Sequence, residues 1–145
     1  MTYQFQYATA LERCSMLSSF EGRDYVGGDG ESLFLNVKIT EQDKPLILTY
    51  MEQAARDIET RLDNMVTSTE YDTDGFTWEL RTEETRWNPD KRMDNSVREA
   101  LVGYAMARWL EDRKPARKAA YDEIWNGSAT MAVANLYRKR APELD

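Results

Sequence analysis

The stretch TEQDKPLILTYMEQAARDIETRLDNMV, residues 40–66, decides the fold of this chain. Its apolar residues recur at spacings of three and four, as they do on one face of an α-helix. They are Ile47, Tyr50, Met51, Ala54, Ala55, Ile58, Leu62, Met65 and Val66. Thr40 can cap the first turn, and Pro45 falls early, where a missing backbone amide costs least. The pattern predicts a long helix over about 41–66 at the centre of a small helical bundle.

Directly after this helix the period of the apolar residues changes from 3.6 to 2. Phe76, Trp78 and Leu80 alternate with polar residues, and the pair Asp74-Gly75 comes just before them. An Asp-Gly pair between alternating segments is typical of a type I′ turn, in which both central residues have positive φ. The sequence therefore predicts one inserted β-hairpin over about 69–81 in a mainly α-helical fold.

Three further helices are expected. The first covers 8–20, with Gly22 as a left-handed C-cap. The second opens at Ser96, which forms a capping box with Glu99, and runs to about residue 113. The third follows Pro115 and continues toward residue 137; the sequence leaves open whether it breaks at 126–128.

The connecting segments carry weaker signals. Residues 26–30 are a glycine-rich loop without the strand-to-helix context of a phosphate-binding loop. Apolar residues alternate over 33–39, which suits a half-buried strand or an extended linker. Residues 82–93 are polar and irregular, with a turn expected at Trp87-Asn88-Pro89.

The composition of the chain excludes several classes of function. The 145 residues fit one domain, 1–145, and carry a net charge of −7. Histidine is absent, which excludes Ser-His-Asp and Cys-His catalysis and histidine-ligated metals. The single Cys14 excludes an intramolecular disulfide framework and reads as a buried thiol. There is no signal segment and no apolar run long enough to cross a bilayer, so synthesis is expected to end in the cytoplasm without a membrane partner.

No cofactor or metal site is expected. Glu70, Asp72, Asp74 and Gly75 superficially resemble a calcium loop, but alignment on Gly75 puts Arg81 where a bidentate Glu is required. Carboxylate pairs such as Glu83-Glu84 are common in so acidic a chain and carry little information. The sequence nominates no catalytic residue, and the expected protein is not an enzyme.

The hairpin is the candidate interface. A two-stranded hairpin is too small to bury Phe76 and Trp78 alone, so these side chains pack either on the helices or on another subunit. Both alternatives stay open at this stage. The interface alternative comprises Tyr71, Phe76, Trp78 and Leu80, and it predicts that Ser at 76 and 78 leaves the fold nearly intact.

A second candidate site is a basic patch in the C-terminal third. It comprises Arg113, Lys114, Arg117, Lys118, Arg138, Lys139 and Arg140. A solvated helical face with cations near helix C-termini is favoured over a nucleic-acid site, since the chain as a whole is acidic.

The order of segments resembles a known family. Residues 39–43 open the long helix, which carries Met-Glu-Gln-Ala-Ala-Arg-Asp-Ile-Glu at 51–59; a β-excursion, residues 97–110 and a basic helix follow. This order and texture are similar to the head–tail connector (adaptor) proteins of long-tailed bacteriophages and prophages, over about 39–137. Residues 1–38 are an N-terminal extension without a counterpart.

The resemblance implies a structural virion protein. A ring of identical subunits would dock beneath the portal, contact the portal and tail-completion proteins, and pass duplex DNA without sequence-specific binding. Such a protein is made in the host bacterial cytoplasm and ends in the virion. An acidic lumen would let the duplex slide. The alternative is a non-enzymatic helical regulatory or adaptor module of a bacterial or prophage system. It would bind one cellular protein through the same hairpin face, as a monomer or dimer and without a ring.

Overall fold

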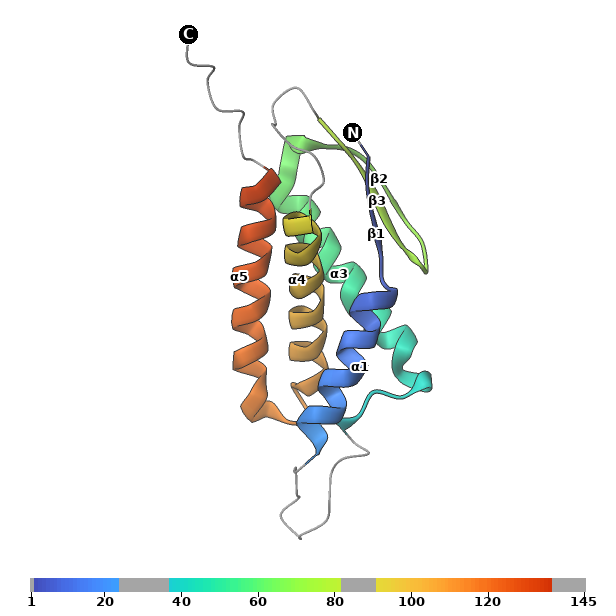
Figure 1. Cartoon of the computed structure of the whole chain (residues 1–145), viewed down its shortest axis with the longest axis vertical. Coiled ribbons are helices and arrows are strands. Elements are labelled where there is room, and N and C mark those ends of the chain that lie inside the picture. Colours follow the sequence, from blue (N-terminus) through green and yellow to red (C-terminus); the bar gives the residue numbers. More distant parts are fainter. Residues whose placement is uncertain (1, 24–36, 82–90, 137–145) are drawn as a thin grey trace.

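The computed structural model describes residues 2–23, 37–81 and 91–136. Its elements are β1 (Thr2–Gln6), α1 (Ala8–Gly22), α3 (Lys44–Leu62), β2 (Val66–Tyr71), β3 (Gly75–Leu80), α4 (Lys91–Leu110) and α5 (Lys118–Leu136), with 3-10 turns η1 (Glu41–Asp43), η2 (Asp63–Met65) and η3 (Pro115–Arg117). The helices stand side by side, and a small sheet covers one flank of the bundle (Figure 1). The predicted fold class, mainly α with one hairpin, is confirmed.

The central helix lies where the spacing of the apolar residues predicted it. α3 and its flanking 3-10 turns together span residues 41–65, and its inward face is fully buried along its length. At the start, the Asp43 carboxylate accepts hydrogen bonds from the backbone amide and the hydroxyl of Thr40, at 2.9 and 2.8 Å. At the end, Asp63 adopts a φ of 47°, a left-handed conformation that turns the chain out of the helix toward β2.

The sheet has three antiparallel strands in the order β1-β3-β2, so the second strand of the hairpin is the central one. The predicted hairpin is present, but its type I′ turn at Asp74-Gly75 is wrong. Among the described non-glycine residues only Asp63 has a positive φ, and Gly75 already belongs to β3. Instead, the Asp72 side chain accepts hydrogen bonds from the backbone amides of Asp74 and Gly75, at 2.8 and 2.9 Å.

Gly75 is needed for close approach between strands. A Cβ atom on it would lie 1.9 Å from the carbonyl oxygen of Phe5 in β1. β1 itself was missed by the sequence reasoning, although Tyr3, Phe5 and Tyr7 alternate with polar residues in the pattern of a half-buried strand. The segment treated as an unmatched extension therefore supplies both a strand and α1 to the core.

The other helices differ from expectation mainly at their ends. α1 extends to Gly22, which is helical and not a left-handed cap. α4 begins at Lys91, so Ser96 and Glu99 lie inside the helix and the predicted capping box is wrong. α5 continues without a break through residues 126–128, which answers the question that the sequence left open.

The connections are only partly described. The glycine-rich loop at 26–30, residues 33–36 and the expected turn at 87–89 lie outside the described residues. In the remainder of the segment expected to be a strand or linker, Val37 is helical and no strand forms over 37–40. The indole of Trp109 donates to the carbonyl of Val37 at 2.5 Å, and the amide of Ile39 donates to the Ser18 hydroxyl at 2.9 Å. These bonds tie the segment to α4 and α1.

α4 is the most buried helix, and it lies against α1, α3 and α5. It approaches α5 closely at Gly103. A Cβ atom there would lie 2.8 Å from the backbone nitrogen of Trp125 and 3.1 Å from the carbonyl oxygen of Tyr121. In contrast, a Cβ on Gly127 of α5 would meet nothing within 4 Å.

These two glycines give a matched pair of substitutions. Gly103→Ala should destabilise the fold by about 1–3 kcal/mol, because α4 and α5 must move apart to admit the methyl group. Gly127→Ala should stabilise it by about 0.5–1 kcal/mol, because alanine loses less backbone entropy in a helix. Urea denaturation of both variants measures the difference. Equal effects of the same sign would contradict the close approach of the two helices.

Candidate interaction surfaces

The hairpin aromatics, predicted as a candidate interface, lie in the core of the single chain. Phe76 is 2% exposed, Trp78 is 0% exposed and Leu80 is 3% exposed. The third strand explains this burial: the ring of Phe5 in β1 stacks on Phe76 with centroids 5.3 Å apart. A three-stranded sheet on a helical bundle buries what a two-stranded hairpin cannot. As a surface for another subunit, these three residues are ruled out, and the alternative of packing on the helices is the correct one.

Tyr71, the fourth member of that candidate interface, is half-buried and holds the hairpin on α3. Its hydroxyl donates to the Glu59 carboxylate at 2.8 Å and accepts from the indole of Trp78 at 3.1 Å. The guanidinium of Arg56 lies over its ring, 4.1 Å from the centroid. These contacts are all internal to the chain, so Tyr71 too serves the attachment of the sheet.

The described residues of the basic patch make contacts with other residues of the same chain. The guanidinium of Arg113 lies 3.5 Å from the centroid of the Trp109 ring and donates to the Trp109 carbonyl. Lys118 pairs with Asp122 at 2.7 Å, one turn further along α5. Arg138, Lys139 and Arg140 lie outside the described residues. These contacts support the structural interpretation of the patch over a phosphate-binding one.

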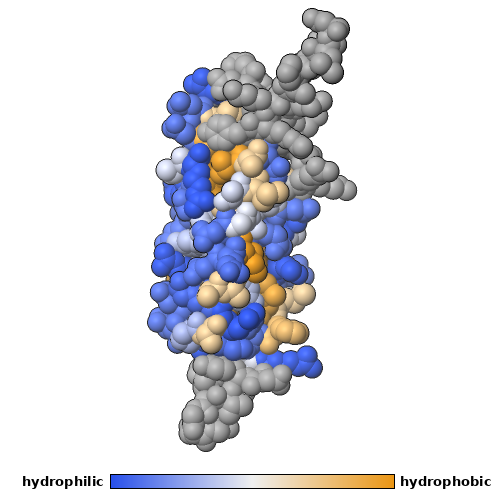
Figure 2. Space-filling model, turned by 90° about the vertical axis from the view of Figure 1, so that its left-hand side faces the viewer, coloured by the Kyte–Doolittle hydropathy of each residue, from blue (hydrophilic) through white to orange (hydrophobic). Residues whose placement is uncertain are grey.

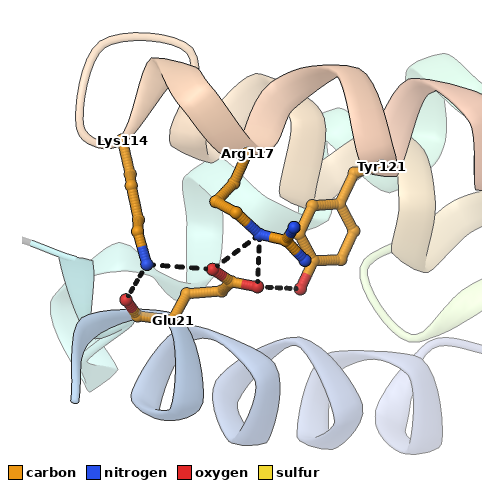
Figure 3. Close-up of polar contacts among 4 residues, drawn as sticks. All are labelled: Glu21, Lys114, Arg117 and Tyr121. Carbon is orange, nitrogen blue, oxygen red and sulfur yellow. Dashed lines mark hydrogen bonds and ion pairs between the residues drawn. The ribbon is translucent and has the colours of Figure 1, made fainter. Parts of the chain in front are cut away.

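Lys114 and Arg117 converge with Tyr121 on a single buried carboxylate, that of Glu21 at the end of α1 (Figure 3). Lys114 lies 3.2 Å from the carboxylate and also donates to the Glu21 carbonyl at 2.6 Å. The Nε of Arg117 is 3.1 Å from both carboxylate oxygens, and the Tyr121 hydroxyl donates at 3.0 Å. The two cations also face the negative end of the α1 dipole.

The protonation of this cluster follows from its contacts. Burial alone would raise the pKa of the Glu21 carboxyl, but hydrogen bonds from Lys114, Tyr121 and Arg117 to its charged form outweigh that effect and lower the pKa. Burial and the neighbouring carboxylate raise the pKa of Tyr121 to about 12. Lys114 and Arg117 were part of the predicted basic patch, but their counter-charge was missed because Glu21 lies more than 90 residues away in the chain. The Glu21 carboxylate is thus paired within the chain, and the cluster attaches the end of α1 to the α4–α5 connection and to Tyr121 of α5.

Cys14 is the remaining candidate for reactivity. It is fully buried in α1, and burial raises the pKa of its thiol to about 12. A protonated, inaccessible thiol is neither a nucleophile nor a metal ligand. Among the described residues, no three Cys, Asp or Glu side chains gather as a metal ion requires. Nor does any helix in this part of the chain combine the length and apolar character needed to cross a membrane.

Two of the exposed large apolar residues lie on α5. Ile124 is 39% exposed and Met131 is 57% exposed. With Ala120, Gly127 and Ala134 they form a strip at spacings of four, three, four and three, which keeps them on one flank of the helix. We call these five residues the α5 strip. On the face that carries α5, hydrophobic side chains form a broken band between hydrophilic ones (Figure 2).

α1 carries a second apolar pair, Met16 at 63% and Phe20 at 70% exposure. The two residues are one turn apart, opposite the buried Ala10, Cys14 and Ser18. α1 and α5 lie on different sides of α4 in Figure 1. The sequence held a signal for the α5 strip, since residues 124–136 contain no charged side chain in a chain that is 31% charged.

Comparisons of the chain with protein-family models, with curated proteins and with solved structures found no match.

Proposed function

We propose that this chain is a structural subunit of a head–tail connector ring of a long-tailed phage or prophage, and that it acts by assembly and not by catalysis. The α5 strip carries the proposal. With the hairpin aromatics buried, the strip offers exposed apolar residues along α5, and its heptad-like spacing suits packing against another helix. The resemblance over residues 39–137 supplies the kind of assembly.

A ring needs two different surfaces on each subunit, because a cyclic contact of more than two copies joins unlike patches. The α5 strip and the Met16–Phe20 pair on α1 are two such patches. In the proposed ring, the α5 strip of one subunit packs against the α1 pair of the next. The net charge of −7 suits a lumen through which duplex DNA slides. The portal and tail-completion proteins are the proposed neighbours in the virion.

The decisive experiment measures mass by light scattering and particle shape by negative-stain microscopy at high protein concentration. The wild type should form rings. Ile124→Glu with Met131→Glu should reduce the mass to that of a monomer, because charges would be buried in an apolar contact. Asn126→Glu with Thr130→Glu places the same charges on the exposed polar flank of α5 and should leave the rings intact.

A mixing experiment tests the head-to-tail arrangement. The α5 variant keeps its α1 pair, and a Met16→Glu, Phe20→Glu variant keeps its α5 strip. Mixed together, the two monomeric variants should form a dimer and nothing larger, because only one intact contact can form between them. If the wild-type protein stays monomeric, or if its largest species is a dimer, the ring is contradicted and the adaptor module is favoured.

A further inference from the structure

A groove of about 490 Å³ lies where the start of α3, the β1–α1 junction and the hairpin turn meet. Its walls combine apolar and polar groups from all three parts of the chain. They are Tyr7, Pro45, Leu48, Thr49, Glu52, Tyr71, Asp72 and Thr73. In Figure 1 the hairpin turn and the start of α1 lie on the side of the bundle away from α5. The groove is therefore separate from the α5 strip.

Tyr7 gives this groove an unsatisfied polar atom. The side chain is 2% exposed, and its ring packs on Phe76 with centroids 5.9 Å apart. Among the described residues, its hydroxyl is the one buried side-chain polar atom without a hydrogen-bond partner. Leaving such a group unpaired is costly, and native structures rarely do so.

The other buried tyrosines show what Tyr7 lacks. The Tyr3 hydroxyl donates to Asp94 at 3.0 Å, and that of Tyr121 donates to Glu21 at 3.0 Å. Both of these hydroxyls are thus matched to a carboxylate of a neighbouring helix. The Tyr7 hydroxyl, at the wall of a groove, lacks a counterpart within the described chain. A partner from outside the chain would complete it.

Two carboxylates give the groove its charge. Burial raises the pKa of Tyr7, and the nearby charges of Glu52 and Asp72 raise it further, while Arg56 lowers it. Glu52 lies 3.6 Å from the Nε of Arg56, longer than a hydrogen bond. One oxygen of Asp72 accepts from the hairpin turn, and no described residue donates to the other. Two carboxylates and one guanidinium therefore act on the Tyr7 hydroxyl, and the sum of their charges is negative.

We propose that this groove binds an arginine side chain presented by a partner polypeptide. The planar guanidinium offers several donors at once, so it can pair with the carboxylates of Glu52 and Asp72. It can also donate to the Tyr7 oxygen, which is covered in the free chain, once the groove wall moves enough to expose that atom. Its alkyl stem would lie along Pro45 and Leu48. A compact ammonium would reach fewer of these acceptors. The net charge of −7 would also attract a basic segment toward the groove.

The test is an NMR titration of the ¹⁵N-labelled Ile124→Glu, Met131→Glu variant, whose changes lie outside the groove. Its result therefore does not depend on ring formation. N-acetyl-arginine amide mimics an arginine within a chain and should cause saturable shifts at the amides of Thr49, Asp72 and Thr73. N-acetyl-citrulline amide, which has the same shape without the charge, should cause none. Free arginine and N-acetyl-lysine amide should bind more weakly; equal or tighter binding of either would overturn the assignment.

Tyr7→Phe removes only the hydroxyl, so it distinguishes an effect of that group on ligand binding from an effect on stability. It should weaken binding of N-acetyl-arginine amide about fivefold, the value of one hydrogen bond. It should leave the urea midpoint unchanged or higher, whereas Tyr121→Phe, which loses a partnered hydroxyl, should lower it. Unchanged binding by the Tyr7→Phe variant, or a lowered urea midpoint for it, would show that the hydroxyl has no role toward a ligand.

Discussion

Replacing both Phe76 and Trp78 with Ser is expected to unfold the chain. Both side chains are almost completely buried, and Phe76 contacts the rings of Tyr3, Phe5, Tyr7, Tyr71 and Trp78. Truncating one buried Phe or Trp costs about 3–5 kcal/mol. The two together reach about 6–10 kcal/mol, which matches the whole stability of an ordinary domain, about 5–15 kcal/mol. Serine adds the cost of a buried hydroxyl.

The measurement is circular dichroism with urea denaturation of the purified variant. The matched control is Met16→Ser with Phe20→Ser, which removes two large apolar side chains from an exposed face. Both variants are made in the Ile124→Glu, Met131→Glu background, so that loss of the proposed ring contact does not enter the comparison. That control should keep its helix content and change stability by less than about 0.5 kcal/mol. If the hairpin variant kept native helix content and a cooperative transition, the aromatics would be dispensable to the fold and the core assignment would fail.

The long helix and the hairpin could be predicted because local patterns determine them. The apolar residues of 44–62 hold one helical period through several turns, and the change to period 2 at the hairpin is abrupt. The residues at which the helices begin and end were harder to predict from the sequence. Ser96 and Glu99 have the spacing of a capping box, but α4 begins five residues earlier, at Lys91. A short polar motif carries little energy beside the burial of Met93 and Val97 on the same helix.

The sequence of the hairpin alone could not show whether its aromatic side chains are buried in the core or exposed at an interface. Whether Phe76 and Trp78 are core or interface depends on β1, whose residues lie 69 to 77 positions before their partners in β3. The alternation of Tyr3, Phe5 and Tyr7 was a usable signal for that strand. The Glu21 cluster left no such signal, because a buried carboxylate is recognised only once distant cations are brought around it.

That carboxylate gives the second large expected effect: Glu21→Gln should destabilise the fold by about 2–3 kcal/mol at pH 7. The change removes the negative charge that lies 3.2 Å from Lys114, and it weakens the attachment of α1 to the segment that leads into α5. Breaking a fully buried pair costs about 3–5 kcal/mol, and the partial exposure of Arg117 reduces that value. The control is Asp57→Asn, which breaks an exposed pair with Arg61 and should cost less than about 0.5 kcal/mol.

The pH dependence identifies the charge as the cause. Because the pKa of Glu21 is lowered in the folded chain, its stabilising contribution is complete above the ordinary carboxyl pKa of 4.5. It is lost as the pH falls through the lower, folded value, where the carboxylate takes up a proton. Urea denaturation at pH 7 and at successive steps below pH 4.5 should therefore show the stabilities of the wild type and the Glu21→Gln variant converging as the pH falls. A difference in stability that persists at the lower pH would mean that Glu21 acts through packing, and that the charge–charge contacts with Lys114 and Arg117 contribute little.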